Sequence, residues 1–164
     1  MSVCDSQRTF ESPLGLLTLT TDGESLTECT FARATAAKSD PLPSSSAKLL
    51  RLAQKKLHRY FAGDRSALDD IPLAPAGTEF QREVWKQLRR IPFGATRSYG
   101  EIAARLGNPG ATRAVGTACG KNPLVLFVPC HRVLAGGQKL GGFSAGLERK
   151  KFLLRLEGVE WIGG

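Results

Sequence analysis

Residues 121–133 read KNPLVLFVPCHRV, the most informative stretch of the chain. Five apolar residues, 124–128, run into Pro129 and predict a short buried strand because they are rich in β-branched and aromatic side chains. Proline has no N–H to donate to a sheet, so we expect the chain to leave the sheet there. Cys130 and His131 follow at once. A thiol next to an imidazole at the end of a buried strand is a candidate activated nucleophile.

Cys130 also has a simpler interpretation. Free cysteine is among the most buried residue types and usually acts as a small hydrophobic side chain. Adjacent side chains of an extended chain point to opposite faces, so Cys130 and His131 need not touch. These two residues alone favour neither interpretation, and the rest of the chain has to decide between them.

Length and composition limit the class of protein. A chain of 164 residues suits one ordinary domain or two small ones. No apolar run approaches the ~20 residues that a membrane helix needs, and the first residues, MSVCD, lack the features of a signal peptide. Four scattered cysteines without a Cys-x-x-Cys pair are typical of a reduced protein. We therefore expect a cytoplasmic protein without a membrane partner.

Positive charge is concentrated in one half of the chain. Residues 1–76 hold nine Lys/Arg and nine Asp/Glu, whereas residues 77–164 hold fourteen Lys/Arg and six Asp/Glu. The whole net charge of +8 therefore lies in the C-terminal half. Such an asymmetry favours a polyanionic partner, most often nucleic acid, over side chains that merely keep the protein in solution.

The N-terminal half, residues 1–76, has the pattern of a small α/β domain. Residues 8–31 alternate between polar and apolar side chains around turn signals and predict an antiparallel meander. Residues 32–46, rich in Ala, Ser and Pro, predict a loop, and residues 47–61 predict an amphipathic helix. The segment 64–77 contains two prolines and is the best candidate for a linker.

The C-terminal half begins with a predicted helix whose N-cap is Thr78. Ser98 and Glu101 form a capping-box pattern at the start of the next helix. Residues 107–110 are a tight break, and Ala111 opens a short helix of small residues. The order helix, glycine-containing turn, helix is typical of a helix-turn-helix.

Arg113 is the one long side chain on that short helix. Small residues let a helix backbone approach a surface closely, and a lone arginine among them suits insertion into a narrow or opened DNA groove. Close packing against a neighbouring helix would explain the small residues equally well. Further along, Gly136-Gly137 predicts the turn of a small wing, residues 141–146 a glycine-rich loop, and residues 147–156 a last, basic helix.

These motifs resemble a known family. The sequence PCHRV at 129–133, preceded by Asn122-Pro123 and by RAVG at 113–116, is similar to the O6-alkylguanine-DNA alkyltransferases. The likeness runs from about residue 77 to 158, and SPLG at 12–15 resembles the family's N-terminal domain. It implies an α/β, ribonuclease-H-like N-terminal domain over 1–76 and an α-helical winged helix-turn-helix domain over 77–164.

The resemblance also implies an activity, the direct-reversal repair of DNA. Such a protein flips an O6-alkylated guanine out of duplex DNA through the minor groove. It then transfers the alkyl group irreversibly to its own cysteine, without a cofactor. A thiolate suits displacement at an alkyl carbon at neutral pH.

The family's reactive residues have counterparts here. By resemblance, Cys130 is the acceptor, His131 takes its proton through a water, and Glu157 orients His131 in the manner of a triad. Tyr99 matches the proton donor to guanine N3, which also crowds the target phosphate. Asn122 matches the asparagine that ties the recognition helix to the active-site strand.

The DNA contacts and the base pocket carry over in the same way. Arg113 matches the finger that replaces the extruded base, and Ala114 and Gly116 match the residues that dock the helix in the minor groove. The pocket residues form a second group, in which the backbones of Cys130, Val133 and Ser144 read the guanine edge, Phe143 replaces a tyrosine of many members, and Lys150 stands behind the lid loop.

A structural zinc, which some members bind, is not expected here. Cys4 stands at a suitable position, but Asp22 and Glu28 lie where its partners would be expected, and the spacing of Cys29 and His58 is not diagnostic. We predict no metal ligand in this chain. We expect a monomer and leave its cooperativity on DNA open.

Two other functions remain to be weighed. A protein that binds alkylguanine without transfer would lack the cysteine, so Cys130 argues against it. A transcription regulator would read bases with polar side chains, and the small-residue helix carries few. Cys119, near that helix, is interpreted as a packing residue.

Overall fold

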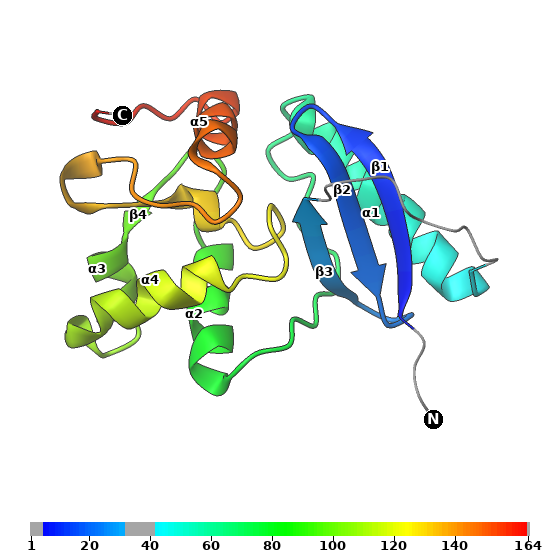
Figure 1. Ribbon diagram of the computed structural model, residues 1–164, viewed down its shortest axis with the longest axis horizontal. Helices are drawn as coiled ribbons and strands as arrows, with labels where there is room; N and C mark the ends of the chain where they lie inside the picture. The colour runs from blue at the N-terminus through cyan, green and yellow to red at the C-terminus, as the bar shows by residue number, and fades with distance from the viewer. Residues whose placement is uncertain (1–4, 32–41, 164) are drawn as a thin grey trace. The chain divides into compact units, whose positions relative to one another are not determined.

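A computed structural model describes residues 5–31 and 42–163 (Figure 1). The chain divides into two compact units. Residues up to Ala76 together with Pro123–Phe127 form the first, and Gly77–Asn122 together with the chain from Val128 form the second. The placement of Pro123–Phe127 departs from the expectation that residues 77–164 fold together, because this segment bonds to the first unit.

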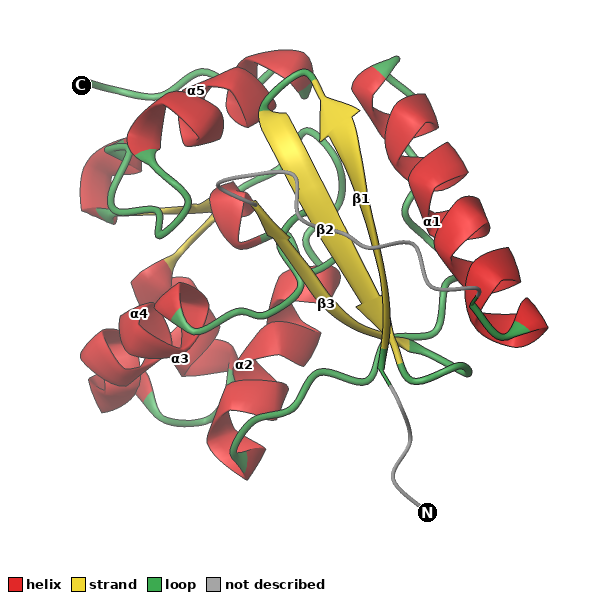
Figure 2. Ribbon diagram, turned by 45° about the vertical axis from the view of Figure 1, so that its right-hand side comes forward, coloured by secondary structure: helices red, strands yellow, loops and turns green. Residues whose placement is uncertain are grey.

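The first unit is built on the predicted antiparallel meander, which is confirmed. Strands β1 (Ser6–Ser12), β2 (Gly15–Thr21) and β3 (Leu26–Phe31) pair in the order β1-β2-β3. Helix α1 (Ser44–Phe61) packs against β1 and β2 along one face of the sheet (Figure 2). The helix begins inside the stretch expected to be a loop. The rest of that loop, residues 32–41, lies outside the described residues.

Apolar side chains at helical spacing join α1 to the sheet. Its buried positions repeat every three or four residues, so they form one face of the helix. The sheet contributes the alternate, inward-facing side chains of β2, which are fully buried. The core of this unit includes Leu17, Leu19, Leu50, Ala53, Leu57 and Tyr60.

The prediction of a strand over residues 124–128 is wrong, whereas the prediction that these residues are buried is confirmed. Leu124 makes only an isolated bridge to Cys29 of β3, with Cys29 N–H donating to the Pro123 carbonyl at 2.8 Å. Leu126 has a φ of 74°, which no strand residue adopts, so the chain turns there. All five side chains are nevertheless buried. Apolar content alone could not distinguish a buried strand from a buried turn.

The second unit holds the helix-turn-helix. Helix α2 (Glu79–Arg89) starts with the predicted N-cap Thr78, whose capping box is closed by Gln81. Helix α3 (Tyr99–Arg105) has Ser98 as its N-cap, accepting a bond from the Glu101 N–H. A 3-10 turn, η1 (Pro109–Ala111), joins it to α4 (Thr112–Gly120), and α4 packs against both α2 and α3.

Short elements complete this unit. Strands β4 (Arg97–Ser98) and β5 (Val133–Leu134) form a parallel pair, and β5 follows directly on the 3-10 turn η2 (Cys130–Arg132). The predicted wing turn is the 3-10 turn η3 (Gly136–Gln138), closed by a bridge between residues 135 and 139. The last helix, α5 (Leu147–Leu156), matches its predicted bounds. Among the described residues, no helix is long and apolar enough to cross a membrane.

Candidate active site

Cys130 lies at the first position of η2, directly after Pro129, and is only 4% exposed. The Asn122 side-chain amide donates to the Cys130 Sγ at 3.2 Å and to the Val128 carbonyl at 2.8 Å. Burial raises the pKa of the Cys130 thiol, whereas the Asn122 hydrogen bond and the Lys150 charge act to lower it. The amide therefore holds the sulfur in place and favours its thiolate form.

His131 is fully buried and bonds through Nε2 to the Glu157 carboxylate at 2.5 Å. Burial would raise the pKa of Glu157, but the hydrogen bond with His131 and the charge and hydrogen bonds of Arg132 lower it to about 2. Burial also lowers the pKa of His131. An ionised carboxylate only accepts hydrogen bonds, so the neutral imidazole carries its proton on Nε2. Its Nδ1 is then the basic nitrogen.

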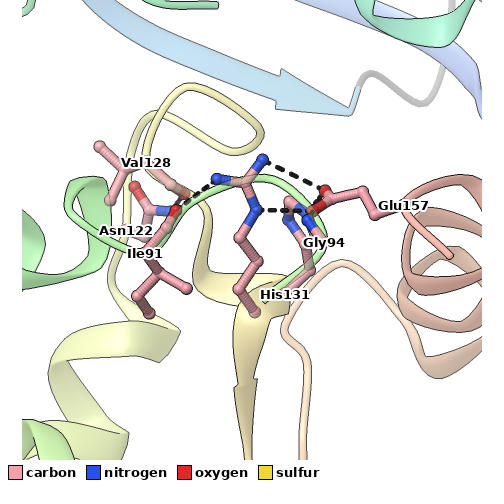
Figure 3. Close-up of polar contacts among 7 residues, drawn as sticks. Ile91, Gly94, Asn122, Val128, His131 and Glu157 are labelled. Carbon is pink, nitrogen blue, oxygen red and sulfur yellow. Dashed lines mark hydrogen bonds and ion pairs between the residues drawn. The ribbon is translucent and has the colours of Figure 1, made fainter. Parts of the chain in front are cut away.

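Arg132 completes this cluster, and sequence reasoning had given it no role. Its Nε donates to Glu157 Oε1 at 2.7 Å, and its Nη1 donates to the Ile91 carbonyl at 2.7 Å. The backbone N–H of Gly94 donates to the same Oε1 at 3.0 Å (Figure 3). The carboxylate is thus held by donors from two separate segments, η2 and the loop that contains Gly94. The Arg132 guanidinium balances the charge of the carboxylate, so His131 need not be protonated to do so.

A pocket of about 330 Å³ opens beside Cys130. This volume lies at the small end of the ~300–1,000 Å³ range of ligand sites. The Tyr99 hydroxyl donates to the Gly142 carbonyl at 3.5 Å, and burial raises the pKa of Tyr99 to about 12, so it remains a proton donor at neutral pH. The lining residues are Tyr99, Gly116, Cys119, Gly120, Cys130, Gly142, Phe143 and Ser144.

Lys150 reaches the pocket loop from α5. Its side chain is fully buried, and its Nζ donates to the Val133 carbonyl at 2.8 Å and to the Gly142 carbonyl at 3.0 Å. Burial lowers the pKa of Lys150 to about 8. The ammonium thus ties the predicted lid to β5. Val133, which was expected to take part in the pocket, does not line it; the residue is fully buried and its carbonyl accepts the Lys150 hydrogen bond.

The predicted DNA-contacting residues lie on the outer side of α4. Arg113 and Ala114 are exposed, and the Arg113 side chain forms no ion pair within the described part of the chain. Gly116 lies beside the Tyr99 ring, where an added Cβ would lie 3.9 Å from the ring carbon Cδ1. The helix therefore presents one face to solvent and one glycine to the pocket.

The other cysteines of the described residues are also buried. Cys119 was interpreted as a packing residue; it is buried, but it also lines the pocket. Cys29 is fully buried in β3. Among residues 5–31 and 42–163, no group of three or more His, Cys, Asp or Glu could hold a metal ion. Cys4 lies outside the described residues.

A helix-turn-helix, together with a buried pocket cysteine that precedes a carboxylate-bound histidine, is the pattern of a nucleic-acid-binding protein with a candidate reactive thiol. Two family models match the chain. The DNA-binding domain of 6-O-methylguanine DNA methyltransferase matches residues 79–159, and the ribonuclease-like domain of the same proteins matches residues 7–75. The chain belongs to this family. The expected fold, an α/β ribonuclease-like domain followed by a helical DNA-binding domain, is confirmed.

Individual relatives agree with this assignment. The chain is 47% identical to a methylated-DNA–protein-cysteine methyltransferase of Methanosarcina acetivorans, covering 91% of this chain and 96% of the relative. A protein of the same description from Haemophilus influenzae is 43% identical, covering 93% and 86%. The crystal structure of Mycobacterium tuberculosis OGT in complex with DNA matches with a TM-score of 0.80 at 45% identity, covering 92% and 91%. The activity is direct-reversal repair, in which an alkyl group passes from alkylguanine in DNA to a cysteine of the protein itself.

Proposed function

We propose that Cys130 is the cysteine that accepts the alkyl group from O6-alkylguanine in duplex DNA. The observation that carries this assignment is that, of the two cysteines that line the pocket, Cys130 directly precedes a carboxylate-bound histidine, whereas Cys119 does not. The sulfur forms a bond to the alkyl carbon while the bond from that carbon to O6 breaks. The thioether that results is stable, so each molecule reacts once.

The proton of the thiol leaves through His131. Because the Nε2–H of His131 donates to Glu157, the lone pair of Nδ1 is available to take the Cys130 proton, relayed by one water. Glu157 and Arg132 keep the imidazole in this tautomer and stabilise the imidazolium that forms. Asn122 favours the thiolate through its bond to Sγ. His131 is thus the base, while Glu157 and Asn122 are positioning residues.

The leaving guanine needs a proton donor and a closed pocket. Tyr99 lies in the pocket wall and stays protonated at neutral pH, as a donor to guanine N3 must. Phe143 and Ser144, on the glycine-rich loop, line the pocket. The Ser144 backbone is assigned by resemblance to the edge of the base. Lys150 holds this loop from below through the Gly142 carbonyl. The Cys130 backbone, assigned to the same edge by resemblance, completes the proposed recognition, whereas the Val133 carbonyl accepts a hydrogen bond from Lys150 instead.

Duplex DNA docks on the exposed face of α4. Arg113 replaces the flipped base in the stack, and Ala114 and Gly116 allow the helix to enter the minor groove closely. The supporting observations are that Arg113 forms no ion pair with any residue that the structure describes, and that α4 carries a face of small side chains. Flipping an alkylated guanine costs less than flipping a normal one because its pairing is weaker.

The site also bears on assembly and location. Every residue assigned here belongs to one unit of a single chain, so a monomer is sufficient for the reaction. The acceptor must stay a free thiol, which a reducing compartment maintains. We therefore place the protein in the cytoplasm as a monomer.

Intact-protein mass spectrometry tests the acceptor assignment. After incubation with a duplex containing O6-methylguanine, we expect the mass of one added methyl group, mapped to the peptide that contains Cys130 and absent with undamaged DNA. Cys130→Ala should bind the duplex and gain no mass. A methyl group on Cys119 in the wild-type protein would overturn the assignment.

A further inference from the structure

The N-terminal unit carries no net charge in sequence, yet its charges are not evenly spread. Nine Lys/Arg balance nine Asp/Glu over residues 1–76. Helix α1 nevertheless contains five Lys/Arg and no Asp or Glu. In the sequence, the excess of positive charge lies only in the C-terminal half. The structure adds a second cationic surface, on a unit that looked neutral.

A shallow groove follows this helix where it meets β1. It has a volume of about 430 Å³ and belongs entirely to the first unit. Its lining side chains are mostly cationic, and Ala62 is the single apolar residue among them. We call it the α1 groove; it is lined by Arg8, Arg51, Gln54, Lys55, His58, Arg59 and Ala62.

Three of its four Lys and Arg side chains lack a carboxylate partner. Within residues 5–31 and 42–163, Arg8, Arg51 and Lys55 form no ion pair. Arg8 donates through Nε to Gln54, an uncharged partner that orients its guanidinium. Arg59 is the exception, since its guanidinium is paired with Asp64. The groove therefore keeps at least three positive charges that no carboxylate of the described residues neutralises.

The spacing of these charges works against helix stability. Arg51, Lys55 and Arg59 follow one another at i, i+4, where like charges repel; Arg51 and Lys55 repel in full, whereas the ion pair with Asp64 weakens the contribution of Arg59. Their row spans about 12 Å of helix axis at 1.5 Å per residue. A DNA strand carries one phosphate per ~3.4 Å of axis, so a row of this length faces about three phosphates. A row of anions is the ligand that relieves this repulsion.

We propose that the α1 groove is a second DNA-contacting surface, which binds the phosphate backbone of duplex DNA independently of the helix-turn-helix. Phosphate contacts supply affinity without reading sequence, so this surface would hold the protein on undamaged as well as damaged duplex. The flexible side chain of Lys55 and the oriented guanidinium of Arg8 can each pair with a phosphate of a polyanion.

The test compares two double variants with equal charge. Arg51→Gln/Lys55→Gln removes two groove cations, whereas Lys48→Gln/Lys56→Gln removes two cations of the same helix that do not line the groove. Binding to an undamaged duplex is measured between 50 and 200 mM salt, the range over which phosphate contacts are resolved. Transfer from free O6-benzylguanine and a thermal melt verify that each variant retains its active site and fold.

We expect the groove variant to lower the slope of log K against log salt by about 1.8, or ~0.9 for each lost contact. Its affinity at 0.1 M salt should fall roughly tenfold for each contact, and the control variant should change far less. Equal losses in the two variants would mean that only net charge matters, and no loss in either would mean that DNA does not use the groove. A weaker affinity for heparin with unchanged DNA binding would assign the groove to another polyanion. Each of these three results overturns the proposal.

Discussion

Glu157→Gln is the most informative single substitution at the proposed active site. It keeps the size and one carbonyl oxygen of the side chain but removes the charge that faces His131 and Arg132. The glutamine amide can also donate to Nε2 of the histidine, which would move the imidazole proton to Nδ1 and abolish its role as base. We therefore expect losses in both stability and transfer rate.

The size of the stability loss follows from the pKa of the carboxylate. The folded protein lowers the pKa of Glu157 from 4.5 to about 2, a difference that corresponds to about 3 kcal/mol. Removing one partner of a buried ion pair costs a similar ~3–5 kcal/mol, because the other charge stays buried. Arg132, 9% exposed, is that stranded charge. We expect the free energy of unfolding at pH 7 to fall by about 3 kcal/mol.

The pH dependence has a definite sign. A carboxylate whose pKa is lowered on folding stabilises the native state above its unfolded pKa, and that stabilisation is lost as pH falls toward the folded value. The difference between wild type and variant should therefore be full at pH 7 and shrink between about pH 4.5 and 2. Glutamine does not titrate, so the variant itself lacks this component.

Urea unfolding at pH 7 and pH 3.5 measures the difference, and single-turnover transfer from an O6-methylguanine duplex measures the rate. We expect roughly a 10²-fold slower transfer, the usual contribution of a general base. A conservative control is Glu160→Gln, an exposed carboxylate of the same region. A loss of stability in Glu157→Gln that is as large at pH 3.5 as at pH 7 would show that the carboxylate charge is not its source.

Three further substitutions test separate parts of the site and fold. Asn122→Ala removes the hydrogen bond to Sγ and should shift the pH profile of transfer to higher pH. The reaction at pH 7 should be roughly 10–100-fold slower, because a hydrogen bond worth ~1.5–3 kcal/mol is lost. A pH profile that does not move would contradict a role of Asn122 in favouring the thiolate. Arg113→Ala should slow repair of duplex DNA far more than transfer from free O6-benzylguanine, and equal effects in the two assays would exclude the finger role. Gly77→Ala should destabilise the protein by about 1–3 kcal/mol in urea unfolding, because a Cβ there would lie 2.6 Å from the buried Trp85 ring; the matched change Gly120→Ala, which meets no neighbour within 4 Å, should be close to neutral.

Local rules account for what could be predicted correctly without coordinates. Thr78 and Ser98 cap their helices because a side-chain oxygen next to unpaired N–H groups is favourable in any context. The meander followed from alternation, and the bounds of α5 followed from its composition. The order of Cys130 and His131 after Pro129 is likewise a property of neighbours in the chain. Such features depend on a few adjacent residues, so sequence reveals them.

The charge cluster of the site depended on contacts across the chain. Glu157 contacts His131 and Arg132, which lie 26 and 25 residues earlier in the chain, and the resemblance supplied only the first of these pairs. Nothing in the local pattern distinguishes Arg132 from a solvated arginine, or Lys150 from the other cations of α5. Their burial follows from how α5 packs against η2.

The sequence by itself determined the helices, the meander, the reactive motif and the excess of positive charge in the C-terminal half. Only the tertiary structure decided that residues 124–128 form a buried turn, that Gly77 lies against Trp85, and that Cys119 shares the pocket of Cys130. The same holds for the cations of the α1 groove, which a balanced composition conceals. The physical reason is that caps and periodicity act over one or two turns of chain, whereas burial, pKa values and close approaches arise between segments that only folding brings together.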